Sequence, residues 1–184
     1  MPICYASLSM ERPVSSSAPT AFTPAGGYGD TSLSRYEREL PAPILGDDEA
    51  LDSGVPDLRG TWKVAELLVN GVTAPADHHL WAHVERIEQS GNRVIVVGGG
   101  VIHDFDSCDG TLENGLHDVM AIDFSTPLQV AASFDDGVLV MRPHGMPVEV
   151  RRWREGEQLV WEYSIAFTAR LDRIASLPSA GNLW

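Results

Sequence analysis

The chain has 184 residues, a formal charge of −13 and a single lysine, Lys63, among its thirteen basic residues. This length predicts one domain that is large enough to bury a hydrophobic core. Such acidity without a basic face disfavours nucleic acids, because phosphate contacts supply most of their affinity for proteins, and it equally disfavours anionic membrane surfaces.

The N-terminal sequence MPICYASLSMERP has neither the basic start nor the long apolar stretch of a secretory signal. The longest apolar run, residues 94–102, contains three glycines and is too short to span a bilayer. The two cysteines, Cys4 and Cys108, do not make a disulfide framework. These features predict a soluble, cytoplasmic protein without a structural disulfide.

Residues 1–56 contain seven of the twelve prolines and are expected to form an N-terminal extension with little order of its own. The segment TSLSRYEREL, residues 31–40, is the exception, because Tyr36 and Leu40 lie at helical spacing and a proline follows. A helix of two turns is marginal alone and needs a surface to lie on. Both a free extension and a docked one remain open. If the extension is a docked lid, deleting residues 1–40 should cost activity more than stability.

From Gly60 onward, short apolar runs alternate with turn sequences. The eight runs span residues 61–69, 80–89, 93–97, 117–124, 128–134, 138–141, 148–153 and 159–171. The second run also fits one face of a helix, but the turn Ser90-Gly91-Asn92 and the apolar run after it favour a strand in a hairpin. Sandwiches and barrels both fit eight short strands; nearest-neighbour hairpins favour an antiparallel barrel, which also removes exposed strand edges. The prediction is thus an all-β protein with an eight-stranded antiparallel barrel in residues 57–184.

The last run alternates most clearly between large apolar and other residues. The first set is Leu159, Trp161, Tyr163, Ile165, Phe167, Ala169 and Leu171. In an eight-stranded barrel this face would point inward and line a core or a small-ligand cavity.

Gly60-Thr61-Trp62 at the start of the first strand, together with a late arginine, Arg170 or Arg173, resembles the lipocalin-like proteins. In that family the tryptophan plugs the closed end of the barrel and packs against the arginine. Two stretches, RIEQSGNRVIVVGGGVIHDFDSCDGTLENGLHDV and RPHGMPVEVRRWREGEQLVWEYSIAFTARLDRI, are similar to the small bacterial cyclases of spirotetramate and spirotetronate polyketide biosynthesis. The resemblance implies a formal [4+2] cycloaddition without a cofactor, and an N-terminal extension that folds over the barrel mouth.

The stretch VGGGVIHDFDSCDG suggests three kinds of site. Gly98-Gly99-Gly100 lacks the Lys and Ser/Thr of a phosphate-binding loop and fits a bend of the barrel better. Its aspartates depart from the EF-hand order, so a solvated acidic loop is expected. A transition-metal site made of His103, Asp104, Asp106 and Cys108 would need further ligands from elsewhere.

The cluster His78, His79 and His83 has no glutamate after His79, where Leu80 stands, so it lacks the H-E-x-x-H pattern of zinc peptidases. No metal is expected there. No G-x-S-x-G sequence or activated cysteine is present either, which disfavours covalent catalysis.

Polar residues on apolar strands are the remaining candidates for a cavity with a few placed donors. The expected catalytic hydrogen-bond donors are Tyr163, Gln129 and His117. The expected substrate-binding residues are Trp81, Glu66, Met141, Phe134, Trp161, Tyr36 and Leu40.

The leading hypothesis is a cofactor-free cyclase for a hydrophobic polyketide tetramate or tetronate, with the N-terminal extension as a lid. The rival hypothesis is a lipocalin-like carrier of a hydrophobic small molecule. A third is a haem-binding barrel, which would require His117 or His83 inside the cavity. A homodimer stays open.

Overall fold

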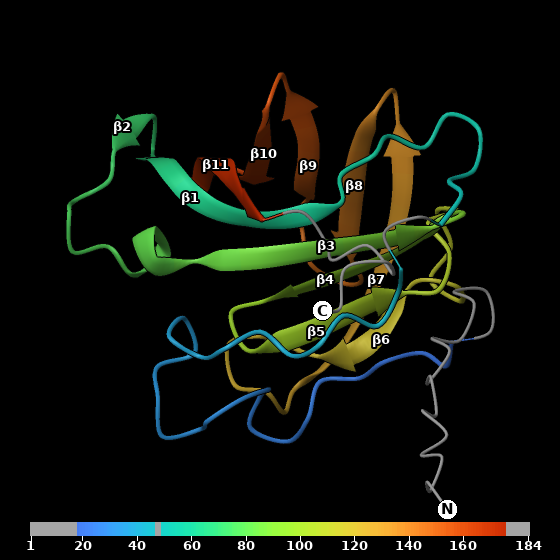
Figure 1. Ribbon diagram of the computed structural model, residues 1–184, viewed down its shortest axis with the longest axis horizontal. Coiled ribbons are helices and arrows are strands. Elements are labelled where there is room, and N and C mark those ends of the chain that lie inside the picture. The colour runs from blue at the N-terminus through green and yellow to red at the C-terminus, as the bar shows by residue number, and fades with distance from the viewer. Residues whose placement is uncertain (1–17, 47–48, 176–184) are drawn as a thin grey trace, which may run out of the picture.

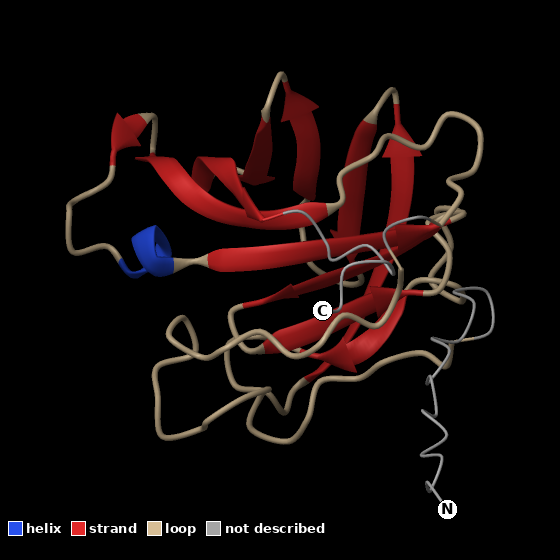
Figure 2. Ribbon diagram, in the orientation of Figure 1, coloured by secondary structure: helices blue, strands red, loops and turns tan. Residues whose placement is uncertain are grey.

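The computed structural model describes residues 18–46 and 49–175. Ten antiparallel strands follow one another in a nearly closed barrel, in the order β5-β4-β3-β1-β11-β10-β9-β8-β7-β6, and the short β2 pairs with β1 (Figures 1 and 2). The elements are β1 (Gly60–Val69), β2 (Val72–Thr73), the 3₁₀ helix η2 (His79–Ala82), β3 (Val84–Ser90), β4 (Arg93–Gly98), β5 (Val101–Phe105), β6 (Leu116–Val119), β7 (Pro127–Asp135), β8 (Val138–Pro143), β9 (Val150–Glu155), β10 (Gln158–Tyr163) and β11 (Phe167–Ala175). In the part of the chain that is described, no helix has the length and apolar character needed to cross a membrane.

The predicted all-β antiparallel barrel is confirmed, but the expected eight strands were too few. β5 follows the glycine turn as an additional strand, and the single run 159–171 is the hairpin of β10 and β11. Ser164 bends the chain there with a φ of 42°, and Ile165 at the tip is 94% exposed. In the run 80–89 the preferred strand is confirmed as β3, which contains Val84 and Ile87, and the helical alternative is wrong apart from the single 3₁₀ turn η2 before it.

The Gly-x-Trp motif begins β1 and places its tryptophan in the hydrophobic core. Trp62 is fully buried, with the guanidinium of Arg173 4.4 Å and that of Arg154 5.2 Å from its ring centroid. Gly60 has a φ of 144°, and a Cβ atom there would lie 2.5 Å from Nη1 of Arg173. Only glycine therefore leaves room for the arginine over the tryptophan. Of the two expected arginines, Arg173 makes this contact, whereas Arg170 pairs with Glu155 on the surface.

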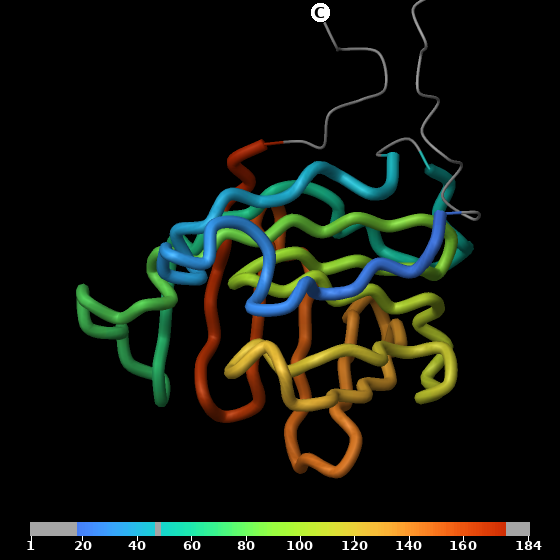
Figure 3. Tube along the Cα trace, turned by 90° about the horizontal axis from the view of Figure 1, so that it is seen from below, coloured from blue at the N-terminus to red at the C-terminus, as the bar shows by residue number. Residues whose placement is uncertain are grey.

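Residues 18–46 are an ordered part of the protein and lie against the outer face of β3, β4 and β5 (Figure 3). Leu45 is fully buried there and Tyr28 nearly so, in a second apolar cluster with residues of β4 and β5. The buried carboxylate of Glu88 on β3 accepts hydrogen bonds from the backbone N–H groups of Ile44 and Leu45, at 2.8 and 2.6 Å. The alternative of a docked segment is therefore confirmed for these residues.

The helix expected over residues 31–40 is wrong, because this stretch forms consecutive turns. Asp30 accepts hydrogen bonds from the backbone and the hydroxyl of Ser32, and Arg38 donates to the carbonyl oxygens of Gly26 and Leu33. So short a segment gains little from helix formation, and these contacts hold the turns instead.

The same segment bridges β5 and β6, the two ends of the strand path. Thr23 donates from its backbone N–H and its hydroxyl to the carboxylate of Asp118 on β6, at 2.9 and 3.0 Å. Its hydroxyl also accepts from the N–H of Ile102 on β5, at 3.0 Å. Asp104 on β5 is 1% exposed and binds Arg93 and the N–H of Ala21, so the expectation of a solvated acidic loop is wrong for this residue. The N-terminal segment therefore completes the barrel wall at its seam.

Candidate functional site

A cavity of about 340 Å³ lies inside the barrel, lined by residues of β3 to β10 and of the N-terminal segment. This volume is within the range of pockets that hold small organic molecules. Its wall is largely apolar and includes Val96, Val101, Phe105, Leu116, Val130 and Met141. Its mouth is lined by Met120, Ile122, Met146 and, from the N-terminal segment, Arg35 and Tyr36.

A buried polar cluster stands on one part of this wall. Glu85 on β3 accepts from Nε and Nη2 of Arg152 on β9, at 2.8 and 3.0 Å. Three strands separate β3 from β9 in the sheet, so this ion pair crosses the barrel interior. His83 completes the cluster, with Nε2 3.0 Å from a carboxylate oxygen of Glu85.

Arg152 lies with its guanidinium 5.0 Å from the ring centroid of Trp161, its neighbour on β10. Its remaining terminal nitrogen, Nη1, reaches the thioether sulfur of Met141 at 3.5 Å, which is a weak acceptor. Glu85 and Trp161 therefore hold the guanidinium in place. Its Nη1, which reaches only the weak acceptor of Met141, could donate to a stronger acceptor on a ligand.

Burial alone would raise the pKa of Glu85, but Arg152 and His83 outweigh it and lower this pKa to about 2. Glu85 is therefore ionised at neutral pH. His103, also on the cavity wall, has its pKa lowered mainly by burial, and its Nε2 lies 3.1 Å from the carbonyl oxygen of Val119.

Gly98 on β4 makes room for this cluster. It stands opposite Glu85 in the β3–β4 pair. A Cβ atom at Gly98 would lie 2.9 Å from Cβ of Glu85 and 3.1 Å from Cε1 of His83. Gly98, the last residue of β4, must therefore be glycine to leave room for the side chains of Glu85 and His83.

The depressed pKa of Glu85 predicts a loss of stability in acid. Because the folded-state pKa, about 2, lies below the ordinary 4.5, its contribution is complete above pH 4.5 and is lost as the pH falls toward 2. A difference of this size corresponds to about 3 kcal/mol. Urea unfolding of the wild type and Glu85→Gln between pH 6 and pH 2 measures it, and the difference between their free energies of unfolding should shrink in acid. An equal pH dependence for both proteins would contradict this assignment.

Four of the residues predicted from the sequence line the cavity together: Tyr36, Met141, Trp161 and Tyr163. Tyr163 is half-buried at the end of β10 and stacks on Phe167, with ring centroids 5.7 Å apart. No hydrogen bond joins its hydroxyl to the described residues.

Two of the three expected donors lie outside the barrel, so their placement in the cavity was wrong. Leu116 and Val130 pair across β6 and β7 with buried side chains, so their neighbours His117 and Gln129, which also pair, are exposed on the outer face. Nε2 of His117 lies 2.7 Å from the carbonyl oxygen of Leu112.

Four expected substrate-binding residues do not line the cavity either. Glu66 is exposed because an irregularity between Val64 and Glu66 shifts the alternation of β1. Trp81 packs against the core from η2 and donates to the carbonyl oxygen of Pro75. The remaining two are Phe134, which packs on the core away from the cavity, and Leu40, which belongs to the outer apolar cluster.

Sequence reasoning missed Glu85, Arg152 and His103 as cavity residues. Strand β3 offered a signal, because both of its alternating faces carry charged residues. One face of a barrel strand points to the interior, so at least one of these charged side chains had to lie inside. In β9 the signal was misleading, because Trp153 suggested the inward face, whereas Arg152 is the buried neighbour.

Within residues 18–46 and 49–175, no three His, Cys, Asp or Glu side chains are grouped to hold a metal ion. His78 and His79 stack on each other at 4.6 Å, whereas His83 is buried beside Glu85. Cys108 is a buried free thiol, and burial chiefly raises its pKa to about 12. The other cysteine of the sequence, Cys4, lies outside the described residues.

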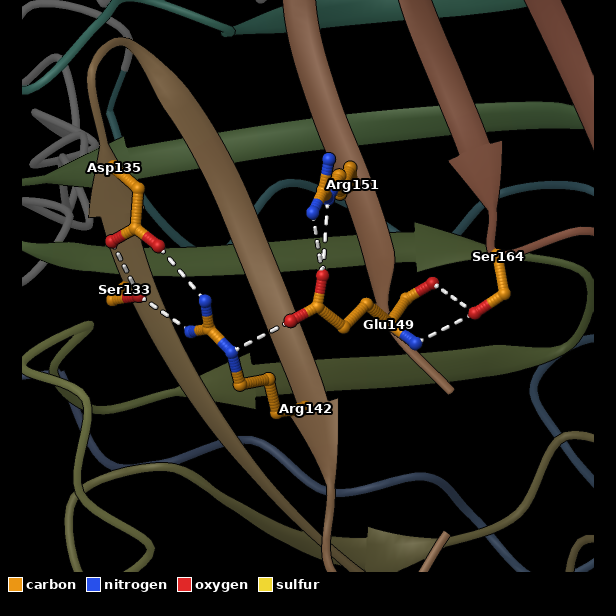
Figure 4. A network of polar contacts seen from close by, with 6 residues as sticks. All are labelled: Ser133, Asp135, Arg142, Glu149, Arg151 and Ser164. Carbon is orange, nitrogen blue, oxygen red and sulfur yellow. Dashed lines mark hydrogen bonds and ion pairs between the residues drawn. The ribbon is translucent and has the colours of Figure 1, made fainter. Parts of the chain in front are cut away.

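A second polar network lies on the outer face of β7, β8 and β9 (Figure 4). Arg142 donates to Ser133, Asp135 and Glu149, and Glu149 also accepts from Arg151. A shallow hollow of about 480 Å³ lies beside it. Because these ion pairs are exposed and satisfy one another, they contribute little to stability and leave no charge for a ligand. The interior cavity is the better candidate although it is smaller.

No protein-family model matches this chain, and no curated protein sequence matches it. Among solved structures, the chain is similar to the one titled "Human cRBP IV", with 17% sequence identity and a TM-score of 0.42. The match covers 64% of this chain and 98% of that chain. At this level of likeness, the assignment of an antiparallel β-barrel rests on the strand pairing within the chain itself.

Proposed function

We propose that the barrel is a cofactor-independent cyclase that closes a ring in a flexible, largely apolar polyketide by an intramolecular [4+2] cycloaddition. The observation that carries the proposal is the cavity itself, an apolar chamber of about 340 Å³ whose polar groups gather on one part of the wall. The resemblance of two long sequence stretches to the spirotetramate and spirotetronate cyclases supports it.

The apolar wall would hold the diene and the dienophile of the folded chain close together. Fixing such a reactive conformation supplies about 7 to 11 kcal/mol of the barrier in the best cases. Leu116, Val130 and Met141 offer shape without reactive groups, which suits a reaction in which no proton or electron has to be supplied.

Hydrogen-bond donors on the polar part of the wall would activate the dienophile. A carbonyl group conjugated to the alkene becomes more electron-poor when a placed donor binds its oxygen. The hydroxyl of Tyr163 and the Nη1 of Arg152 are two such donors. Tyr36 and Arg35 stand at the mouth, where they would limit the entry of water.

The test is to incubate the protein with a linear polyene that carries a conjugated diene and an exocyclic-methylene tetronate. A product of unchanged mass and new retention time, formed faster than in buffer, is the expected result. Substrate that stays linear in the presence of folded protein would refute the proposal.

Tyr163→Phe is expected to lower the cyclisation rate about tenfold, because it removes one donor and keeps the ring that packs on Phe167. The same chromatographic assay measures it. His117→Ala and Gln129→Ala are matched controls that should retain the wild-type rate, since both side chains lie outside the barrel. A Tyr163→Phe protein with an unchanged rate would remove this hydroxyl from the mechanism.

A carrier of a hydrophobic small molecule is the second candidate. It is favoured by the fact that Glu85 and Arg152 already satisfy each other without a reacting partner. In the same assay a carrier would bind the linear compound and release it unchanged.

A further inference from the structure

Two arginines lie against the buried ring of Trp62: Cζ of Arg173 on β11 is 4.4 Å and Cζ of Arg154 on β9 is 5.2 Å from its centroid. Leu159 of β10 pairs with Arg154 and, on its other side, with Leu171. Arg173 stands two residues after Leu171 on β11. Paired residues, and residues two apart on a strand, share one face of a sheet, so both arginines belong to the same face and meet at Trp62.

No carboxylate of residues 18–46 and 49–175 forms an ion pair with either arginine. Asp57 and Glu157 are the carboxylates whose charge reaches Arg173. Asp57 already accepts from Nε and Nη2 of Arg59, at 2.9 and 2.8 Å, and Glu157 is exposed in the turn between β9 and β10. Burial and then the charge of Arg154 lower the pKa of Arg173. Two neighbouring cations without a carboxylate, in a chain of charge −13, indicate an anion from outside the chain.

The backbone engages one terminal nitrogen of each guanidinium. Nη1 of Arg173 donates to the carbonyl oxygen of Arg59 at 2.7 Å. Nη2 of Arg154 donates to the carbonyl oxygen of Gly156 at 2.9 Å. Among the described residues, Nε and Nη2 of Arg173 and Nη1 of Arg154 have no hydrogen-bond partner. Nε and Nη2 form one edge of a guanidinium, which binds two oxygens of an anion side by side, so the two arginines offer this edge and a third donor.

We propose that Arg154 and Arg173 bind a phosphate group, two oxygens of which accept from the Nε and Nη2 edge of Arg173 and a third from Nη1 of Arg154. A carboxylate has only two oxygens and leaves Arg154 unused, whereas phosphate matches both guanidiniums. The ring of Trp62 holds both side chains in place, which reduces the freedom they lose on binding. Neither arginine lines the cavity, so this site is independent of the proposed cyclisation.

The probes for the test are inorganic phosphate, ethyl phosphate and acetate, titrated calorimetrically at pH 8 and constant ionic strength. The wild type should bind phosphate with a dissociation constant of about 1 mM or below, and acetate at least about tenfold more weakly. Ethyl phosphate keeps three terminal oxygens and distinguishes the sources of the group. If it binds as tightly as phosphate, the site takes phosphate esters, and if it is excluded, the site takes the free ion.

Arg154→Gln removes the third donor and one cation, so it should weaken phosphate binding about tenfold or more and reduce the preference over acetate. Arg170→Gln is the matched control, because it removes the same charge from β11 and only breaks the exposed pair with Glu155. It should keep the wild-type affinity for phosphate. Circular dichroism verifies that both variants are folded.

Equal phosphate affinity of the wild type and Arg154→Gln would overturn the site, and so would an equal loss in Arg154→Gln and Arg170→Gln, which would reflect net charge alone. Equal affinity of the wild type for phosphate and acetate would also overturn it. This last comparison needs no variant, so it decides the question even if Arg154→Gln does not fold.

Discussion

Replacing Arg152 by methionine is expected to lower the free energy of unfolding by about 3 to 5 kcal/mol, because Glu85 would keep its burial and lose its main counter-charge. Urea unfolding at pH 7 measures the effect. Arg170→Ala, which breaks the exposed pair with Glu155, is the matched control and should cost at most about 1 kcal/mol. If the two variants lost similar stability, the buried pair of Glu85 and Arg152 would matter no more to the stability of the fold than an exposed ion pair.

The double variant Glu85→Leu with Arg152→Met should recover most of this stability. Two apolar side chains can be buried without the cost of removing charges from water, so no ion pair is needed to offset that cost. It should nevertheless convert the substrate more slowly, because the Nη1 donor of Arg152 would be gone while the hydroxyl of Tyr163 remains. A stable double variant with a lowered rate would show that the buried pair serves the cavity rather than the stability of the barrel. A stable double variant with the wild-type rate would assign the pair no role in the reaction.

The second large effect is expected in the N-terminal segment. Leu45→Ala should destabilise the protein by about 2 to 5 kcal/mol, because Leu45 is fully buried against β4 in the outer apolar cluster. Leu33→Ala in the same segment is the control. Leu33 is 44% exposed, so this change should stay within about 0.5 kcal/mol.

Thermal or urea unfolding of both variants gives the comparison, and deletion of residues 1–46 should be more damaging than either. This expectation replaces the one from the sequence, in which the extension was a lid whose removal cost activity more than stability. The segment carries Thr23, which joins β5 to β6, and the backbone donors that satisfy Glu88. If Leu45→Ala were as stable as Leu33→Ala, the segment would be a dispensable cover after all.

The sequence was sufficient for the barrel wherever local chemistry determines structure. Gly60 and Trp62 mark the first strand because only glycine accommodates the arginine stacked on the tryptophan. The glycines at 98–100 make the turn between β4 and β5 as expected, with positive φ at Gly99 and Gly100. Hairpin turns with glycine elsewhere fixed most of the other strand ends.

Strand ends without such a marker could not be predicted. The sequence WEYSIAFT alternates without a glycine or a proline, so nothing indicates that Ser164 takes a positive φ and divides the run into β10 and β11. The inward set is nevertheless right on both sides of this turn, for example at Trp161 and Ala169, because the two strands pair directly.

The site was predictable only in part, because strand pairing decides whether a side chain points into the barrel or toward solvent. Tyr163 and Trp161 follow from alternation in a long strand, whereas His117 lies in a strand of four residues with too few positions to show which face is buried. Glu85 and Arg152 lie 67 residues apart. In the sequence, each resembles an ordinary charged residue of the surface. Only the folded barrel brings the two side chains together, and no sequence pattern predicts that they pair.

The central claim, that the interior cavity is where the ring is closed, is tested most directly by filling it. Val150 lines the cavity near its mouth and is only half-buried, so Val150→Trp should occupy the chamber without forcing the core apart. The measurement is the cyclisation rate of the linear tetronate diene with wild-type and Val150→Trp protein, after circular dichroism has shown that both are folded. Conversion by the wild type alone is the predicted result. Equal conversion by both proteins would place the reaction outside the cavity and contradict the account.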